Sequence, residues 1–229
     1  MKMLPMAVLL ALGALGAGTA SADTDGDNTV RVGLYDVTFR PHASDISGPY
    51  VPAALNLDVN SIQTLYLGYI RTLAPHFDLE LAVGYPPETK TVGRGPAKLG
   101  SVPYDGQVIS TARWISPTLL LNYEFLDDTH ALRPYVGVGI NYTTFYDRRS
   151  TAAGNAASGG PTRISLTSSV GPTATAGLSY RIASHWRIYG SYSLSRIRSV
   201  LTADTAGVIR TSHISFGPQA LVLAAGYSF

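Results

Sequence analysis

The side chains best able to do catalytic or metal chemistry are the five histidines, and they are scattered along the chain. They lie in turns or beside long polar segments: His42, His76, His130, His185 and His213. No pair has a His-x3-His spacing and none belongs to a Glu-x-x-His motif, so the sequence predicts no metal site. His213 and Ser215 have a spacing that a lipid hydrolase could use, but nothing else supports that alternative. We therefore expect no catalytic residues, no enzyme activity and no cofactor.

The rest of the composition removes further classes of chemistry. The chain has no cysteine, which excludes disulfides, thiolate metal sites and cysteine nucleophiles. Gly93-Arg94-Gly95 is followed by no helical pattern, so it does not predict a phosphate-binding loop. The 17 basic and 15 acidic residues leave a formal charge of +2 with no basic run. A nucleic acid partner is therefore not expected.

The first 22 residues have the three zones of a secretory signal peptide. Lys2 precedes an apolar run over residues 4–15, and Ala20-Ser21-Ala22 follows it. A membrane anchor is the alternative, but the run is shorter than the roughly 20 residues that span a bilayer. We predict a signal peptide over residues 1–22 and a mature domain over residues 23–229. An exported chain of this kind is periplasmic, secreted or inserted in an outer membrane.

The elements that position the remaining side chains repeat with a period of two. Eight segments rich in Tyr, Val, Ile, Leu and Thr predict strands, with Gly, Pro, Asp, Asn and Ser between them. The segments cover residues 29–40, 61–73, 77–85, 107–125, 131–146, 164–182, 186–199 and 212–229. Three links are short turns, at residues 74–76, 127–130 and 183–185, and the other four are long. This asymmetry is typical of a transmembrane barrel with short periplasmic turns.

The alternation within each segment shows which face is apolar. In the last segment Leu221, Leu223 and Tyr227 share one face, whereas Ala224 and Ser228 lie on the other. A soluble barrel such as a lipocalin has its large apolar residues inside, and it could not fill a core with Gly, Ser and Thr. The apolar face must therefore point outward, toward outer-membrane lipid. The fold class is all-β, an eight-stranded antiparallel transmembrane β-barrel in the bacterial cell outer membrane.

Three stretches resemble the outer membrane protein W (OmpW) family. They are Ser116-Pro117-Thr118, residues 133–145 (RPYVGVGINYTTF) and residues 225–229 (AGYSF). The resemblance covers nearly the whole mature chain and implies a small barrel that passes hydrophobic molecules, with some relatives serving as phage or bacteriocin receptors. Tyr227 and Phe229 are similar to the terminal signal recognised by the barrel-assembly machinery. The family carries an aromatic residue before Gly171, where this chain has Val170, which implies a wider or differently gated passage.

Charged residues on the inward face predict a plug. Taking the face opposite the apolar one places six charges near periplasmic turns or termini: Arg31, Glu80, Glu124, Arg133, Arg181 and Arg187. An eight-stranded barrel is narrow enough for side chains to fill, and paired Arg and carboxylate groups would close it. We expect the six to lie at one height. The alternative is that they are ion pairs with a purely structural role.

A plug would force an apolar solute to leave sideways. Residues 49–57 form an unusually apolar loop, and we expect Tyr50, Leu55 and Leu57 to line an entrance. Val170, Gly171 and Pro172 would border a lateral exit, because Pro cannot donate to a ladder and favours a bulge or an open seam. The predicted function is passive diffusion of small hydrophobic solutes with lateral release. An adhesin, a receptor or a purely structural barrel is the alternative.

Overall fold

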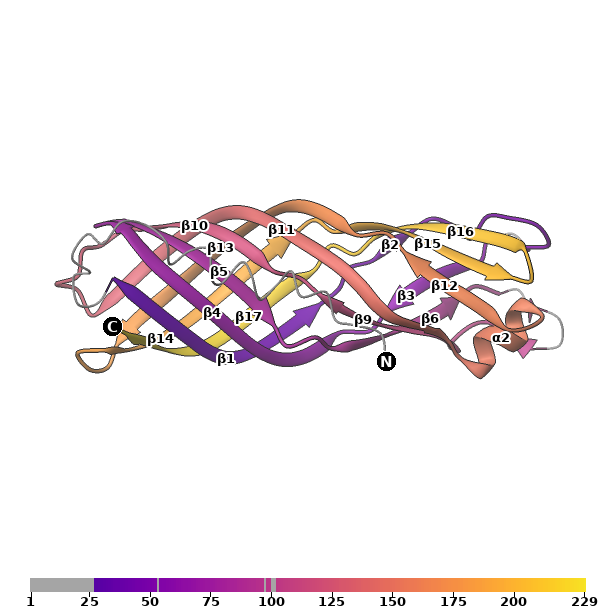
Figure 1. The fold of residues 1–229 in the computed structure, drawn as a ribbon, viewed down its shortest axis with the longest axis horizontal. Helices are drawn as coiled ribbons and strands as arrows, with labels where there is room; N and C mark the ends of the chain where they lie inside the picture. The colour runs from indigo at the N-terminus through magenta and orange to yellow at the C-terminus, as the bar shows by residue number, and fades with distance from the viewer. Residues whose placement is uncertain (1–26, 53, 97, 100–101) are drawn as a thin grey trace.

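The computed structural model describes residues 27–52, 54–96, 98–99 and 102–229 (Figure 1). The predicted signal peptide, residues 1–22, lies outside the described residues. Eight strands form the barrel: β1 (Asn28–Thr38), β4 (Ile62–Ala74), β5 (Phe77–Gly84), β10 (Thr118–Glu124), β11 (Leu132–Ser150), β13 (Ser169–Arg181), β14 (Trp186–Ser195) and β17 (Gln219–Ser228). Each is antiparallel to its neighbours. Pairing of β1 with β17 and of β10 with β11 closes the ladder, which confirms the predicted fold class.

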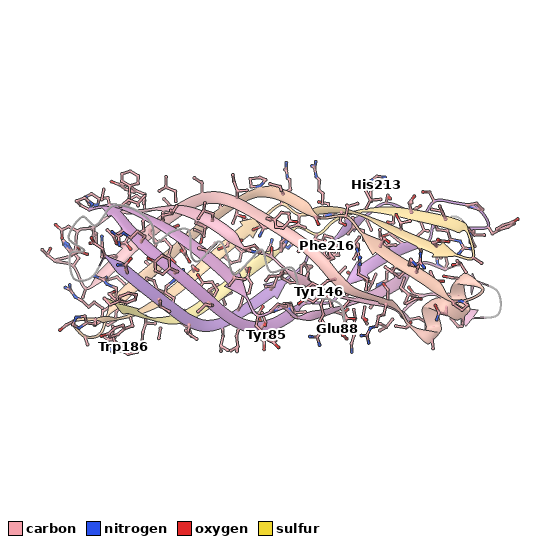
Figure 2. All side chains as sticks on the ribbon, viewed as in Figure 1. Tyr85, Glu88, Tyr146, Trp186, His213 and Phe216 are labelled. Atoms are coloured by element: carbon pink, nitrogen blue, oxygen red, sulfur yellow. The ribbon has the colours of Figure 1, made fainter. Side chains whose placement is uncertain are left out.

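The side chains of the barrel alternate as predicted (Figure 2). Val138 and Leu223 are 65% and 59% exposed on the outside, whereas Val222 is 4% exposed inside. Outward aromatic residues gather at the end with the short turns, where Trp186 packs against Tyr227 at 5.2 Å between ring centroids. Apolar belts bounded by aromatic residues are typical of outer-membrane barrels, in which the short turns are periplasmic. We call this the periplasmic end.

Beyond the barrel the chain continues into a second layer of strands, which we call the extension. One side is the β9 sheet, in which the upper part of β11 pairs with β9 (Val108–Ile115), followed by β6 (Glu88–Arg94) and β3 (Asn56–Val59). The other side is the β15 sheet, with strands in the order β12 (Thr162–Leu166), β15 (Arg198–Thr205), β16 (Val208–Ser215) and β2 (His42–Ala43). Strands β7 (Lys98–Leu99) and β8 (Val102–Pro103) pair separately. Figure 1 shows the extension at the end opposite the short turns.

The extension corrects two predictions. The segments predicted as single strands over residues 107–125, 164–182, 186–199 and 212–229 are each two strands in the structure. Each break lies where the chain leaves the barrel and joins one of the sheets of the extension. Two of the breaks contain proline, at Pro117 and Pro218, which removes a ladder donor. Much of the predicted long links is therefore paired strand.

One short helix, α2 (Ala152–Ser158), follows β11. The Thr151 side chain accepts a hydrogen bond from the Gly154 amide at 3.0 Å and caps its first turn. Gly159 ends it with a φ of 85°, a conformation that glycine adopts readily. Within the part of the chain that the structure describes, no helix is long and apolar enough to cross a membrane.

Candidate functional site

The two sheets of the extension and helix α2 enclose an apolar interior, which we call the chamber. A cavity of about 60 Å³ lies within it. Its wall includes Leu55, Leu57, Tyr104, Ile109 and Leu201. Ala157 from α2 and Ile164 from β12 complete the same wall, and Leu55, Leu57 and Leu201 are buried. The chamber is therefore a space suited to an apolar molecule.

Below the chamber four aromatic rings narrow the interior. Phe39 contacts Trp114 and Phe216 edge to face, with ring centroids 6.1 and 6.2 Å apart, and Phe145 stacks on Phe216 at 5.6 Å. We call Phe39, Trp114, Phe145 and Phe216 the aromatic ring. A smaller cavity of about 20 Å³ lies among them. Figure 2 shows Phe216 near the junction between barrel and extension.

Two donors in this apolar region have no partner. Within the described residues, Tyr104 Oη and Trp114 Nε1 are buried and make no hydrogen bond. Burial raises the pKa of the Tyr104 hydroxyl, so it stays protonated and remains a donor. A buried donor left unpaired costs about 1–3 kcal/mol. Both donors line cavities, one in the chamber and one at the aromatic ring, so a molecule there could accept from them.

Polar side chains form a floor under the aromatic ring. Ser116 bonds Thr143 at 2.7 Å, and the Asn141 amide donates to Ser116 at 2.6 Å and to Thr118 at 2.8 Å. All four are buried inside the barrel wall. On the β10–β11 side the interior therefore changes from apolar to polar at the point where the extension meets the barrel, whereas Val37, Ala220 and Val222 are buried on the β1–β17 side.

The first charged layer lies deeper in the barrel. Arg31 forms an ion pair with Glu80, both almost fully buried, and Tyr66 also donates to the Glu80 carboxylate. Asn122 donates to the second carboxylate oxygen at 2.8 Å. The Arg31 guanidinium lies over the ring of Tyr189 at 4.6 Å. We call this the Arg31 layer, and its charges are paired and hydrogen bonded.

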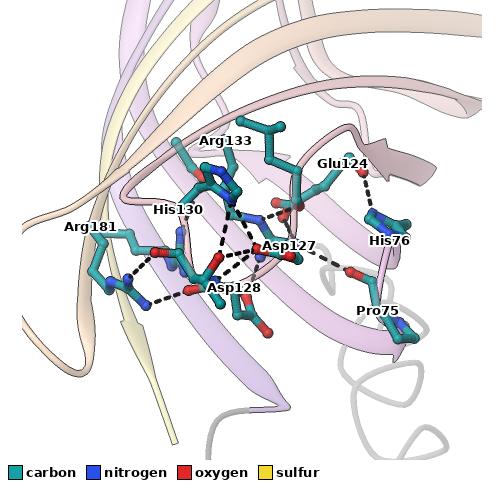
Figure 3. Close-up of polar contacts among 12 residues, drawn as sticks. Pro75, His76, Glu124, Asp127, Asp128, His130, Arg133 and Arg181 are labelled. Carbon is teal, nitrogen blue, oxygen red and sulfur yellow. Dashed lines mark hydrogen bonds and ion pairs between the residues drawn. The ribbon is translucent and has the colours of Figure 1, made fainter.

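A second charged layer closes the periplasmic end (Figure 3). Arg133 contacts Glu124 and Asp128, each at 2.5 Å, and donates from Nε to the Leu126 carbonyl at 2.9 Å. Arg187 lies 3.7 Å from Asp128. We call this the Arg133 layer. A polar cavity of about 240 Å³ lies beside it and is lined in part by Asp78, Glu124 and Arg133.

The prediction of a single height for the six charges is wrong. Arg31 and Glu80 form one layer, Glu124, Arg133 and Arg187 contribute to the other, and no ion pair between the layers is found among the described residues. Arg31 and Glu80 lie three residues beyond the first residues of β1 and β5, whereas Glu124 ends β10 and Arg133 and Arg187 are second in β11 and β14. A strand rises about 3.3 Å per residue, so Arg31 and Glu80 lie deeper in the barrel. Arg181 is in neither layer. It donates to the carbonyls of Asp128 and Thr129 in the turn, at 2.7 and 3.3 Å.

The predicted mouth residues separate in the structure. Leu55 and Leu57 are buried in the wall of the chamber, Leu55 to 1% exposure. Tyr50 is 85% exposed with a φ of 58° and is absent from that wall. The apolar loop thus folds inward at Leu55 and Leu57, because they follow the alternation of β3, and Tyr50 belongs to the outer surface.

The predicted exit residues lie inside an intact ladder. Val170, Gly171 and Pro172 pair with Tyr142, Asn141 and Ile140 of β11 without any register shift, so the predicted bulge at this ladder is wrong. The Pro172 carbonyl accepts from the Arg196 amide at 3.0 Å. In a strand the amide and carbonyl of one residue point to the same side, so the missing Pro172 donor faces β14. Pairing with β14 accordingly begins only at Thr173. Val170 is 70% exposed on the outside and does not narrow the interior.

A gap in the backbone pairing occurs just above these residues. The β11–β13 ladder ends at Thr143 and Ser169, after which β11 pairs with β9 and β12 pairs with β15. Among the described residues no backbone hydrogen bond joins the upper part of β11 to β12. Two side-chain bonds cross instead, from Ser168 to Thr144 at 3.1 Å and from Arg148 to the Leu166 carbonyl at 3.2 Å. We call this boundary the seam.

The opposite junction between the two sheets is held differently. There the Ile46 amide donates to the Leu55 carbonyl at 2.8 Å, and the Asn56 side chain donates to the Ala43 carbonyl at 2.9 Å. One backbone bond therefore joins that side directly. Among the described residues, the seam is the junction between the two sheets that has no such backbone bond.

Sequence reasoning missed the residues around the charges and in the aromatic ring. Tyr66, Tyr135, Tyr189 and Asn122 surround the Arg31–Glu80 pair, and Trp114 and Phe145 narrow the interior. The four residues around the ion pair all occupy inward positions, where alternation alone would have placed them. Large residues on a face expected to be small and polar were the available signal.

Closed strands, an outward apolar belt and buried ion pairs in the lumen define a bacterial outer-membrane β-barrel. No group of three or more side chains suited to hold a metal occurs among the described residues. The OmpW family model matches residues 24–229, and the chain belongs to the OmpW family.

Relatives and solved structures agree with this assignment. Outer membrane protein W of Vibrio cholerae is 28% identical over 96% of this chain and 97% of that protein. The protein of the same name from Salmonella typhimurium is 30% identical over 96% of each chain. The crystal structure of OprG from Pseudomonas aeruginosa has a TM-score of 0.80 at 22% identity, covering 90% of this chain and 96% of that one. The solution structure of Escherichia coli outer membrane protein W has a TM-score of 0.57 at 25% identity, covering 90% and 100%.

Proposed function

We propose that this barrel passes small hydrophobic molecules by passive diffusion and releases them sideways into the outer membrane. A solute enters the extension, occupies the chamber and leaves through the seam. One observation carries the proposal: the apolar interior ends on a polar floor at the height where the seam begins. Thr143 belongs to both features, since it bonds Ser116 in the floor and is the last β11 residue paired with β13.

The closed lumen argues against a route along the barrel axis. An apolar solute moving down from the aromatic ring would meet the floor, then the Arg31 layer, then the Arg133 layer. Inserting an apolar group there would separate buried polar groups from their partners, at a cost of about 1–3 kcal/mol for each one left unpaired. The two layers together act as the plug in this proposal, with Arg181 bracing the turn that carries Asp128.

The seam offers the lower barrier. Opening it breaks two side-chain hydrogen bonds and no backbone ladder among the described residues. The predicted exit residues Val170, Gly171 and Pro172 lie directly below, where an intact ladder forms the lower border of the opening. Beside them Tyr142 and Ile140 face outward, so a released solute meets the apolar belt at once.

Relatives support an apolar solute. A Pseudomonas aeruginosa protein named as dibenzothiophene metabolism operon protein PahQ is 31% identical over 127 residues, covering 53% of this chain and 54% of that protein. Its name connects it with an operon for an apolar aromatic compound. Tyr227 and Phe229, exposed on the last strand and at the chain end, are our proposed signal for the barrel-assembly machinery.

The test fills the chamber from the helix. Ala157 is buried against the chamber and Ala156, its neighbour on α2, is exposed. Ala157→Phe should lower uptake of a hydrophobic compound several-fold by occupying the cavity, and Ala156→Phe should leave it unchanged. Uptake is measured in cells with equal amounts of heat-modifiable protein at the surface. Equal uptake by both variants and wild type would favour an adhesin or a structural barrel.

The unpaired donors refine the kind of solute. Trp114 Nε1 and Tyr104 Oη favour a molecule that carries a hydrogen-bond acceptor, such as a ketone, over the matching alkane. Trp114→Phe keeps an aromatic side chain at this position but removes the indole N–H donor. We expect the ratio of ketone to alkane uptake to fall in this variant, while alkane uptake changes little. A ratio equal to wild type would contradict a role for the indole donor.

A further inference from the structure

A group of basic residues lies on the outside of the molecule, at the junction between barrel and extension. It consists of Arg40, His42, Arg196, Arg198 and His213, which we call the basic patch. Phe39, Ile197 and Phe216 pack into the interior, so the alternation of each strand turns the basic residues outward. All five are exposed, and Figure 2 shows His213 on the outer surface.

Strand register brings the basic patch together. Leu194 pairs with Gln219 and Arg198 pairs with Ser215, so Arg196 lies beside Gly217. On the other side of Gly217 is Arg40, whose Cβ would lie 4.0 Å from a Cβ placed on that glycine. One row above, Ser215 separates Arg198 from His42. Arg40 and Arg196 are therefore two strands apart, about 10 Å, and Gly217 between them has no side chain.

The arginines of the patch have no carboxylate partner in the part of the chain that the structure describes. Among the described residues, no carboxylate lies within ion-pair distance of Arg40, Arg196 or Arg198. The nearest carboxylate along β1 is Asp36, four residues from Arg40, and it accepts from Gln63 at 2.6 Å. Three other arginines of the extension, all on the β9 sheet, are paired with carboxylates. On the β9 sheet Asp147 contacts Arg149 at 2.7 Å and Arg113 at 3.8 Å, and Asp58 contacts Arg94 at 3.0 Å.

The patch lies at the upper edge of the apolar belt. Leu194 is exposed two residues below Arg196 on β14, and Leu221 is exposed four residues below Gly217 on β17. A strand rises about 3.3 Å per residue, so the charges begin within about 15 Å of these leucines. That interval corresponds to the change from acyl chains to headgroups in the outer leaflet.

We propose that the basic patch binds the phosphate of an outer-leaflet lipid headgroup. A guanidinium donates two parallel hydrogen bonds to phosphate oxygens, and the space over Gly217 lets Arg40 and Arg196 approach one phosphate from both sides. The acyl chains of the same molecule lie along Leu194, Leu221 and Leu223. Exposed charges hold a free anion weakly. The lipid is therefore bound because both of its parts are engaged.

The experiment titrates the purified barrel in detergent with lipid A that carries both phosphates, and native mass spectrometry measures the bound fraction. Arg40→Gln with Arg196→Gln should weaken binding about tenfold. The matched control, Arg113→Gln with Arg149→Gln, removes two arginines from the paired side and should bind like wild type. Wild type should bind dephosphorylated lipid A as weakly as the patch variant binds lipid A.

Three results would overturn the proposal. The first is equal affinity of the patch variant and wild type, and the second is equal loss in the control variant. The third is displacement of lipid A by inorganic phosphate at a similar concentration, which would identify a site for free anions. The patch variant must show the heat-dependent gel shift of a folded barrel. If it does not, the test is the binding of phosphorylated and dephosphorylated lipid A to wild type, and equal binding of the two would overturn the proposal.

Discussion

At the scale of single residues, the Arg31–Glu80 ion pair is almost completely buried. Glu80 accepts from Arg31, Tyr66 and Asn122, so its removal leaves a buried guanidinium without its counter-charge. We expect Glu80→Ala to lower the free energy of unfolding by about 3–5 kcal/mol. Urea unfolding in lipid vesicles measures this. The double variant Arg31→Met with Glu80→Leu should recover most of the loss, and a double variant as unstable as Glu80→Ala would contradict the account.

A second residue-scale prediction concerns the turn between β10 and β11. Hydrogen bonds from Thr129, and then His130, lower the pKa of the Asp127 carboxyl to about 2. Because the folded pKa lies below the ordinary value, the stabilisation is complete above that value and disappears as the pH falls through about 2. Thr129→Val should raise the pKa of Asp127 toward the ordinary value. Carbon-detected NMR titration of Asp127 checks this, and an unchanged pKa would show that the threonine bonds are not the cause.

At the scale of elements, the sequence predicted what local alternation determines. The outward positions of Val138, Leu223 and Tyr192 followed from the period of two, because side chains alternate across any strand. The two depths of the charges were missed because positions up to three residues from a turn were treated as one height, although a strand rises about 3.3 Å per residue. The sheets of the extension were also missed, because their pairing joins strands that are distant in sequence, such as β2 and β16. The prediction of a bulge at Pro172 was wrong because the sequence does not show which neighbouring strand its backbone nitrogen faces. That depends on the register of the strands.

The two charged layers change what is expected of the plug. Glu124→Ala with Arg133→Ala removes charges from the Arg133 layer only, and the Arg31 layer with its tyrosines still crosses the lumen. We therefore expect no rise in ion conductance in planar bilayers from this double variant. Adding Arg31→Ala and Glu80→Ala should open a conducting lumen. Conductance from the double variant alone would show that the Arg31 layer by itself does not close the barrel.

At the scale of the whole molecule, the barrel and the extension have different interiors. The barrel is closed by a continuous ladder and carries two charged layers in its lumen, whereas the extension is two sheets around an apolar interior. The sheets separate at the seam, where side chains alone cross between β11 and β12 among the described residues. The proposed transport route avoids the lumen and rests on this division. From the sequence, a charged plug and a Gly-Pro pair suggested lateral release. The gap between β11 and β12 became visible only from the strand pairing in the structure.

The central claim is that solute leaves through the seam, and a reversible cross-link tests it most directly. The chain has no cysteine, and Ser168 Oγ lies 3.1 Å from Thr144 Oγ1 across the seam. Cysteines at both positions should form a disulfide when oxidised. A matched pair at Thr173 and Ser195, whose hydroxyls are 2.8 Å apart, joins β13 to β14 where a ladder already exists. We predict that oxidation of the seam pair reduces uptake of a hydrophobic compound to the level of cells without the protein, and that reduction of the disulfide restores it. Oxidation of the matched pair should leave uptake unchanged. Full uptake through a quantitatively cross-linked seam would contradict lateral release.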